Sequence, residues 1–182
     1  MNDKTLRIYT DGGCSGNQHD RNLGGWGAVL EFGTARKELY GSEPNTTNNR
    51  MEMTALLEAF KAIVRENQNI IVFSDSSYLM DCFRQKWYVN WQRNGWRNSK
   101  KKPVANREIW EELLPYLDRH QITFCRVKGH VNLDSPQTNT DKLYETFLKW
   151  YGSGYSYEEF VHVTEMNNRA DELANKGIDE IR

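Results

Sequence analysis

The sequence predicts a single α/β domain in which a five-stranded mixed β-sheet is flanked by α-helices. Three observations support this prediction. The first quarter of the chain holds three runs in which apolar and polar residues alternate, as in strands with one buried face. Further along, short apolar runs alternate with segments of helical period, as in βαβ units. The length of 182 residues fits one domain.

The strands are expected where the apolar period is two residues or where a short run is wholly apolar. Residues 6–11 alternate and lead into the turn signal Asp11-Gly12-Gly13. Residues 70–73 are apolar throughout, as in a central strand that is covered on both faces. The five strands are expected at residues 6–11, 25–32, 36–41, 70–73 and 122–127.

The helices are expected where apolar residues recur every three to four positions. One such stripe runs from Met53 to Val64. Thr140 is a candidate N-cap, and Ser156 with Glu159 has the spacing of a capping box. The helices are expected at residues 48–65, 76–87, 106–117, 140–151 and 168–181.

The composition excludes several classes of protein. No run of eighteen apolar residues occurs, so we expect no membrane span and no membrane partner. The first residues lack the apolar core of a secretory signal. The three cysteines, Cys14, Cys82 and Cys125, are odd in number and widely spaced. This argues against a disulfide framework or a CxxC zinc site, and favours the reducing cytoplasm.

Residues 84–107, which we call the basic segment, carry a net charge of +8, and the rest of the chain carries −9. Trp87, Trp91 and Trp96 are interleaved with the cations. Two interpretations are open. Either the segment is an arm that grips a polyanion, which we favour, or it is a helical hairpin whose tryptophans face the core.

Four carboxylates occupy positions where they could converge. Asp11 and Asp75 each follow an expected strand, and parallel neighbouring strands would bring both to the same carboxyl edge. Glu52 and Asp171 each lie in the first turns of an expected helix, in line with its apolar side chains. Taken singly, the first two could be turn formers and the other two could favour a helix dipole.

Taken together, the four carboxylates predict one site. Carboxylates that close would repel and shift each other's pKa values unless cations lay between them. Hard divalent ions, Mg²⁺ or Mn²⁺, suit a site made of carboxylates without a cluster of Cys or His.

Five motifs resemble, in the same order, those of type 1 ribonuclease H, the bacterial ribonuclease HI family. They are IYTDGGCSGN at 8–17, TNNRME at 47–52, SDS at 74–76, VKGH at 127–130 and NNRADELA at 167–174. The resemblance implies a ribonuclease H-like fold. It also implies a monomeric endonuclease that hydrolyses the RNA strand of an RNA–DNA hybrid and leaves 5′-phosphate and 3′-hydroxyl ends.

By this resemblance, the catalytic acids are Asp11, Glu52, Asp75 and Asp171. Two Mg²⁺ ions, with Mn²⁺ as a substitute, would lie about 4 Å apart and carry out an in-line displacement. Asp11, Glu52 and Asp75 would hold one ion, and Asp11 with Asp171 would hold the other. His130 matches the family's histidine that moves protons or helps product release, a role that suits an imidazole.

The resemblance also assigns residues to the substrate. Ser77 stands where the family commonly has glutamine, and Asn45 stands where some members have arginine, so one RNA contact and the DNA phosphate pocket are expected to be weaker. The assigned residues are Cys14, Asn17, Asn48 and Asn49 at the minor groove, Thr47 and Asn106 at a DNA phosphate, and Trp87, Trp91, Trp96, Lys100, Lys101 and Lys102 in the basic segment. His19, His120 and His162 match no motif, and we interpret them as structural.

Residues 131–166, which we call the insertion, separate two motifs that lie only a handful of residues apart in typical members. They carry a net charge of −4 and many aromatic residues. Their acidity argues against direct phosphate binding. We hypothesise that they fold into a small helical lobe that restrains His130 and the helix of Asp171. The alternative is a docking surface for a partner.

Two other functions use the same features. A transposase-type or resolvase-type nuclease would cut DNA at a similar acidic site, but it usually needs a separate DNA-binding domain. A non-catalytic module that binds hybrids would be expected to lack one of the carboxylates, and all four are present.

Overall fold

A computed structural model describes residues 4–16 and 22–182 and has a five-stranded sheet at its centre. The strand order is β3-β2-β1-β4-β5. β1 pairs with β2, and β2 with β3, in antiparallel fashion, whereas β4 is parallel to both β1 and β5. The predicted mixed sheet is therefore confirmed. The strands are β1 (Thr5–Ser15), β2 (Leu23–Phe32), β3 (Ala35–Pro44), β4 (Asn69–Ser74) and β5 (Gln121–Arg126).

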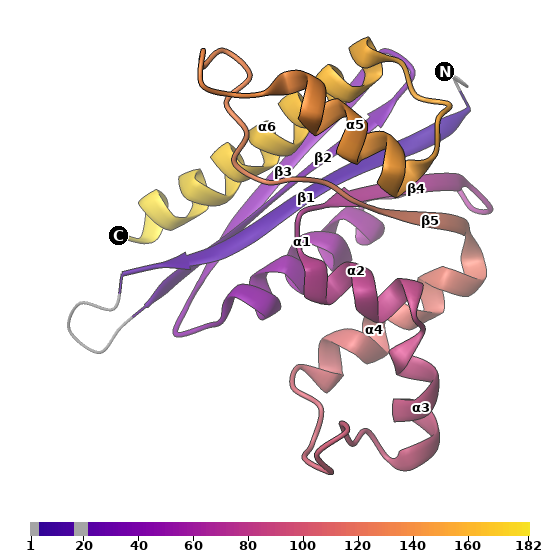
Figure 1. The fold of residues 1–182 in the computed structure, drawn as a ribbon. Coiled ribbons are helices and arrows are strands. Elements are labelled where there is room, and N and C mark those ends of the chain that lie inside the picture. The colour runs from indigo at the N-terminus through magenta and orange to yellow at the C-terminus, as the bar shows by residue number, and fades with distance from the viewer. Residues whose placement is uncertain (1–3, 17–21) are drawn as a thin grey trace.

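Helices cover both faces of the sheet (Figure 1). α1, α2 and α4 lie on one face, α5 and α6 lie on the other, and α3 extends away from the sheet. None of the helices in the described ranges has the length and apolar content needed to cross a bilayer. The helices are α1 (Asn48–Lys61), α2 (Ser77–Arg84), α3 (Trp87–Asn94), α4 (Arg107–Arg119), α5 (Thr140–Tyr151) and α6 (Tyr157–Ile181).

The two faces of the sheet form two apolar clusters. On β4, Ile70 and Val72 point into the cluster with α1, α2 and α4, while Phe73 points into the cluster with α5 and α6. Successive side chains of a strand point to opposite faces of the sheet, so the residues of an apolar run pack into the clusters on both faces. The short apolar run is thus a central strand, as predicted.

The last helix is longer than predicted. α6 begins at Tyr157 rather than at 168, and its first turn carries the expected capping box of Ser156 and Glu159. Buried Phe160 and Val163 extend the apolar face towards the N-terminus, and no glycine or proline interrupts the helix before Asp171. Asp171 therefore lies in the interior of a helix, so the dipole explanation for this residue is wrong.

Other boundaries also differ from the predictions. β1 does not end at Asp11 but continues to Ser15, because β2 pairs with it that far. α1 ends at Lys61, which leaves Val64 94% exposed instead of on the buried stripe. The expected helix at 76–87 divides into α2 and α3 at Lys86, whose backbone is left-handed with a φ of 55°.

The insertion is folded onto the sheet. Its C-terminal part forms the beginning of α6, and its central part forms α5, whose N-cap is Asn139 rather than Thr140. Phe147 of α5 and Phe160 of α6 are each 5% exposed and belong to the apolar cluster on that face. The hypothesis of a helical lobe packed on the body of the domain is therefore supported.

Polar contacts tie the long helix α6 to the sheet. Glu159 accepts a hydrogen bond from Arg7 at 3.3 Å, and His162 Nε2 lies 2.9 Å from Glu31. Close approach is possible because β2 has glycine at position 27, where a Cβ would lie 2.3 Å from the carbonyl oxygen of Ala170. The first of these contacts lies near the start of α6 and the last lies beside Asp171, so the helix is held along the part that carries this acid.

Candidate active site

The register of the two central strands brings Asp11 and Asp75 together. The last parallel pair between β1 and β4 is Thr10 with Ser74. Asp11 directly follows Thr10, and Asp75 directly follows Ser74. The two acids therefore emerge side by side at the carboxyl edge of the sheet. Side chains at the carboxyl ends of parallel strands are where open α/β sheets build their sites.

Glu52 joins these two acids from the first turns of α1. One carboxylate oxygen from each of Asp11, Glu52 and Asp75 lies within 4.8 Å of the other two. Asp11 is 5% and Glu52 is 7% exposed. Glu52 Oε2 is buried without a hydrogen-bond partner. A buried carboxylate oxygen with no donor is costly unless a cation meets it.

Asp171 and His130 complete the cleft. Both residues line the same hollow of about 480 Å³ as the three clustered acids. His130 Nδ1 lies 3.7 Å from Asp171 Oδ2, and the His130 side chain is 74% exposed. The structure therefore brings all four predicted carboxylates and the predicted histidine to one place. If Asp11 and Asp75 were only turn formers, and Glu52 and Asp171 only favoured a helix dipole, the four acids would have no reason to converge.

Burial and mutual repulsion raise the pKa values of the clustered acids. Burial, with the negative charge of Asp75 as the next cause, raises the pKa of Asp11 to about 8. Burial and then the charges of Asp11 and Asp75 raise the pKa of Glu52 well above its usual range. Burial also raises the pKa of Asp75. A divalent cation held among these oxygens would favour the charged forms, so the donor set fits such an ion.

The raised pKa of Asp11 predicts how the stability of the metal-free protein depends on pH. Between the ordinary value of 3.8 and about 8, the folded state holds a proton that the unfolded state has lost. The free energy of unfolding should therefore fall as the pH rises through this window. Urea unfolding at several pH values in EDTA measures it. The Asp11→Asn variant should show a smaller fall, and equal falls in both proteins would contradict the assignment.

Cys14 and Asn48 lie at the rim of the cleft. Asn48 Oδ1 accepts a hydrogen bond of 2.8 Å from the Cys14 amide, which ties β1 to the start of α1. Both residues line the cleft with the acids. Asn17, the fourth residue predicted at the minor groove, lies outside the described residues.

Thr47 and Asn106, predicted to share a phosphate pocket, are joined by a residue that the sequence did not single out. The Arg50 amide donates to Thr47 Oγ1 at 3.1 Å, and Arg50 Nη1 donates to Asn106 Oδ1 at 3.2 Å. The same guanidinium pairs with Glu43 and Glu108. Its place in the TNNRME motif was the only sequence signal, because Asn106 and Glu108 come from a distant segment.

The basic segment has a mixed role, and one part of the prediction is wrong. Trp91 and Trp96 are 8% and 7% exposed and pack into the core with Trp110, so their rings are not free to stack on a nucleic acid. The core-facing alternative holds for these two residues. Trp87 is half-buried and lines a hollow of about 660 Å³ together with Asn49.

Lys100, Lys101 and Lys102 are exposed on a turn of the basic segment. The Asn98 side chain accepts from the amides of Lys100 and Lys102, and Asn98 also accepts from the Lys101 amide through its carbonyl oxygen. The turn thus has a fixed backbone, and buried Trp91 and Trp96 anchor the chain on either side of Gly95. The tryptophans hold the segment and the lysines carry its charge.

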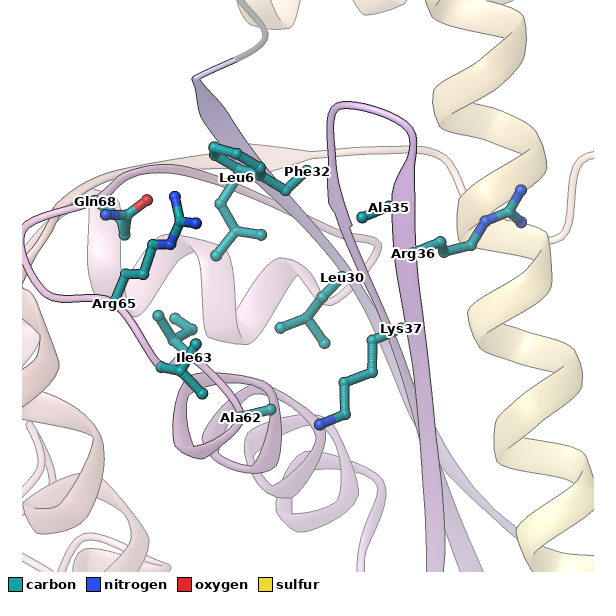
Figure 2. Close-up of a pocket in the computed structure, with 11 residues that line it drawn as sticks. Leu6, Leu30, Phe32, Ala35, Arg36, Lys37, Ala62, Ile63, Arg65 and Gln68 are labelled. Atoms are coloured by element: carbon teal, nitrogen blue, oxygen red, sulfur yellow. The ribbon is translucent and has the colours of Figure 1, made fainter.

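Another hollow, of about 290 Å³, lies beside the end of α1 and the β2–β3 turn (Figure 2). Leu6, Leu30 and Ile63 point into it, with Arg36, Lys37 and Arg65 around them. Among the described residues that line it, none is an acid, a histidine or a cysteine. It therefore lacks the carboxylate, imidazole and thiolate side chains that usually bind a metal ion.

Comparisons with known proteins show which family this chain resembles. The family model described as RNase H matches residues 3–146. The match ends within α5, so Asp171 lies beyond it. Among solved structures, the solution structure of the PFV RNase H domain has a TM-score of 0.62 and 26% identity, covering 95% of this chain and 93% of that domain. A type 1 RNase H with the type 2 active-site motif has the same TM-score at 24% identity, covers 92% of this chain and 85% of its own, and supports the fold.

Two curated relatives show how far the similarity extends. Ribonuclease H of Moorella thermoacetica is 50% identical over 136 residues, which cover 75% of this chain and 86% of the relative. Ribonuclease H of Hyphomonas neptunium is 41% identical over 183 residues, which cover 100% of this chain and 98% of the relative. The latter alignment therefore includes the insertion and Asp171. With a family model that matches most of its length and relatives this similar, the chain belongs to the RNase H family.

Proposed function

We propose that this protein is an endoribonuclease that hydrolyses the RNA strand of RNA–DNA hybrids and leaves 5′-phosphate and 3′-hydroxyl ends. The observation that carries the proposal is the convergence of Asp11, Glu52, Asp75 and Asp171 on one cleft beside exposed His130. Relatives named Ribonuclease H support the activity. A related structure solved in complex with an RNA/DNA hybrid has the same fold and supports the substrate.

The carboxylates are proposed to hold two divalent ions, with Mg²⁺ as the expected metal and Mn²⁺ as a substitute. Asp11, Glu52 and Asp75 would hold one ion, and Asp11 with Asp171 the other. When bound, such ions activate a water molecule and stabilise the leaving 3′ oxygen. The protein's own contribution is to fix the acids: Asp11 and Asp75 through the strand register, and Glu52 through the capped start of α1.

His130 is proposed to exchange protons with the substrate or the departing product at the mouth of the cleft. Its ring is exposed to solvent and lies beside Asp171, on the lining of the cleft that is proposed to hold the reacting phosphate. Imidazole gains and loses a proton near neutral pH, as this role requires.

The hybrid is proposed to lie across the cleft and along the face that leads to the basic segment. Cys14 and Asn48 offer short polar groups at the cleft, and Asn49 with Trp87 lines the next hollow. Short groups at a minor groove can test for the 2′-hydroxyls that distinguish RNA from DNA. The enzyme is proposed to act as a monomer in the cytoplasm, where its three free cysteines would stay reduced.

A cleavage assay on labelled duplexes tests the proposal. A hybrid, a matched DNA duplex and a matched RNA duplex are incubated with Mg²⁺, with Mn²⁺ or with EDTA. We expect the RNA strand of the hybrid to be cleaved and both other duplexes to stay intact. This cleavage should disappear in EDTA. Cleavage of the DNA duplex would favour a transposase-type nuclease, and binding without cleavage would favour a non-catalytic module.

Neutralising Lys100, Lys101 and Lys102 together to Gln should raise KM far more than it lowers kcat. The lysines attract the phosphate backbone equally in the ground state and the transition state. The salt dependence of hybrid binding should also flatten, by about one unit of slope for each lost phosphate contact. Binding titrations at several salt concentrations measure this slope. An unchanged slope would mean that the turn does not touch the nucleic acid.

A further inference from the structure

We propose that Asn168 is a positioning residue that holds the loop of residues 128–131 against α6, so that His130 stays beside Asp171. This inference rests on the proposed role of His130 in hydrolysis. It assigns to one side chain of the long helix a task that neither the motifs nor the charge pattern had indicated.

The first observation is a pair of contacts between the same loop and the same helix. Asn168 Nδ2 donates a hydrogen bond of 2.8 Å to the carbonyl oxygen of Val131. One residue earlier, His130 Nδ1 lies 3.7 Å from Asp171 Oδ2. Asn168 and Asp171 are three residues apart, so they lie on one face of α6. The amide therefore secures the backbone directly beside the residue that it would position.

The second observation comes from the other side of the loop. A Cβ added at Gly129 would lie 2.1 Å from Asp75 Oδ2, so the loop backbone rests directly against this carboxylate. The loop is thus confined between Asp75 on the β4 side and Asn168 on α6. Glycine at this position allows the contact, and the amide of Asn168 prevents the loop from moving outward.

The third observation is the backbone conformation of His130. Its φ is 55°, in the left-handed region that residues other than glycine seldom occupy. Such a conformation persists only where the surroundings impose it. The hydrogen bond from Asn168 to the next residue is a contact that can impose it, since the ring of His130 is itself mostly exposed.

The insertion continues from the same loop as folded chain. Val131 lines a narrow gap together with Leu143 and Phe147 of α5. Beyond it, the Thr138 hydroxyl donates to the carbonyl oxygen of Asn132 at 2.6 Å, which closes a turn. The chain that leaves His130 is therefore folded, and Asn168 joins this folded part to the helix of the active site.

The expected consequence is a selective loss in the rate of the chemical or product-release step. A loop that opens moves His130 away from Asp171 without altering the surfaces that bind the hybrid. The near-isosteric change Asn168→Leu should lower kcat by about three- to tenfold, the effect of one net hydrogen bond, and leave KM within about twofold.

The test combines kinetics with hydrogen exchange. kcat and KM are measured on a labelled hybrid with Mg²⁺, and amide exchange in residues 128–131 is measured on the metal-free protein. Asn168→Leu should lower kcat and speed exchange in this loop. Asn168→Gln, which keeps an amide donor, should recover part of both. The control is Asn139→Ala, which removes the N-cap of α5 and should lower the melting temperature without lowering kcat at 25 °C.

Three results would overturn the proposal. They are an unchanged kcat in Asn168→Leu, unchanged exchange of residues 128–131, or a Gln variant that behaves like the Leu variant in both measurements. A parent protein that failed to cleave the hybrid would instead overturn the proposed function. In that case the exchange data would still decide whether Asn168 holds the loop.

Discussion

Replacing Asp11 with Asn is expected to abolish hydrolysis of the hybrid while leaving hybrid binding intact. Asp11 is the acid proposed to contact both ions, and Asn keeps its shape but removes the charge. We expect kcat to fall by at least about 10²- to 10³-fold, as when a group that stabilises the transition state is lost. A gel assay with Mg²⁺ and a binding titration measure the two effects. Cleavage within about tenfold of the parent would show that the site assignment is wrong.

The same substitution should make the metal-free protein more stable near pH 8. Buried Asp11 and Glu52 and half-buried Asp75 each have one carboxylate oxygen within 4.8 Å of the others, and their charged forms repel each other. Removing one charge relieves that repulsion. Asp118→Asn, at an exposed position on α4, is the matched control and should leave the melting temperature unchanged. If the variant is inactive but more stable than the parent, unfolding cannot be the cause of its inactivity.

The sequence predicted the four carboxylates because each lies next to a local signal. Asp11 and Asp75 follow strands, and Glu52 follows a helix start that the apolar period reveals. The sequence could not show that β1 and β4 are neighbours, and the motif resemblance supplied that step. Asp171 lies on a helix, as expected, but in its interior, because the apolar face of α6 continues back to Phe160.

The burial of Trp91 and Trp96 could not be read from local pattern. Both lie among cations, and only the contacts of Trp91 with Trp110 of α4 and of Trp96 with Trp91 reveal that they belong to the core. The role of Asn168 was hidden for the same reason. Its partner Val131 is separated from it by the whole insertion, and no periodicity reports a hydrogen bond across such a distance.

The insertion contributes to the fold in a way that separates stability from catalysis. Phe147 is buried in the apolar cluster on the α5 and α6 face of the sheet, and the centroids of the Phe147 and Phe160 rings are 5.4 Å apart. Tyr144 also contacts Phe160, and its hydroxyl donates to the carbonyl oxygen of Tyr155. These contacts lie on the face of the sheet below α5 and α6. The residues of the insertion therefore cover apolar surface and do not supply any of the four acids.

Replacing residues 132–156 with a flexible Gly/Ser linker should accordingly lower the melting temperature and leave hydrolysis of the hybrid in place. The change removes α5 but keeps α6, Val131 and all four carboxylates. Loss of buried apolar area, at about 25 cal/mol per Å², should lower the melting temperature by at least about 5 °C. Thermal unfolding followed by circular dichroism measures this shift.

A pair of point variants in α5 separates this effect from a general disturbance of the helix. Phe147→Ala should cost about 3–5 kcal/mol in free energy of unfolding, as for other buried aromatic residues, whereas Lys149→Ala, at an exposed position, should cost little.

Loss of all activity in a linker variant that is demonstrably folded would place the insertion within the catalytic site. An unchanged melting temperature would favour the alternative that the aromatic residues form a docking surface, because a surface kept for a partner adds little to the stability of the free protein.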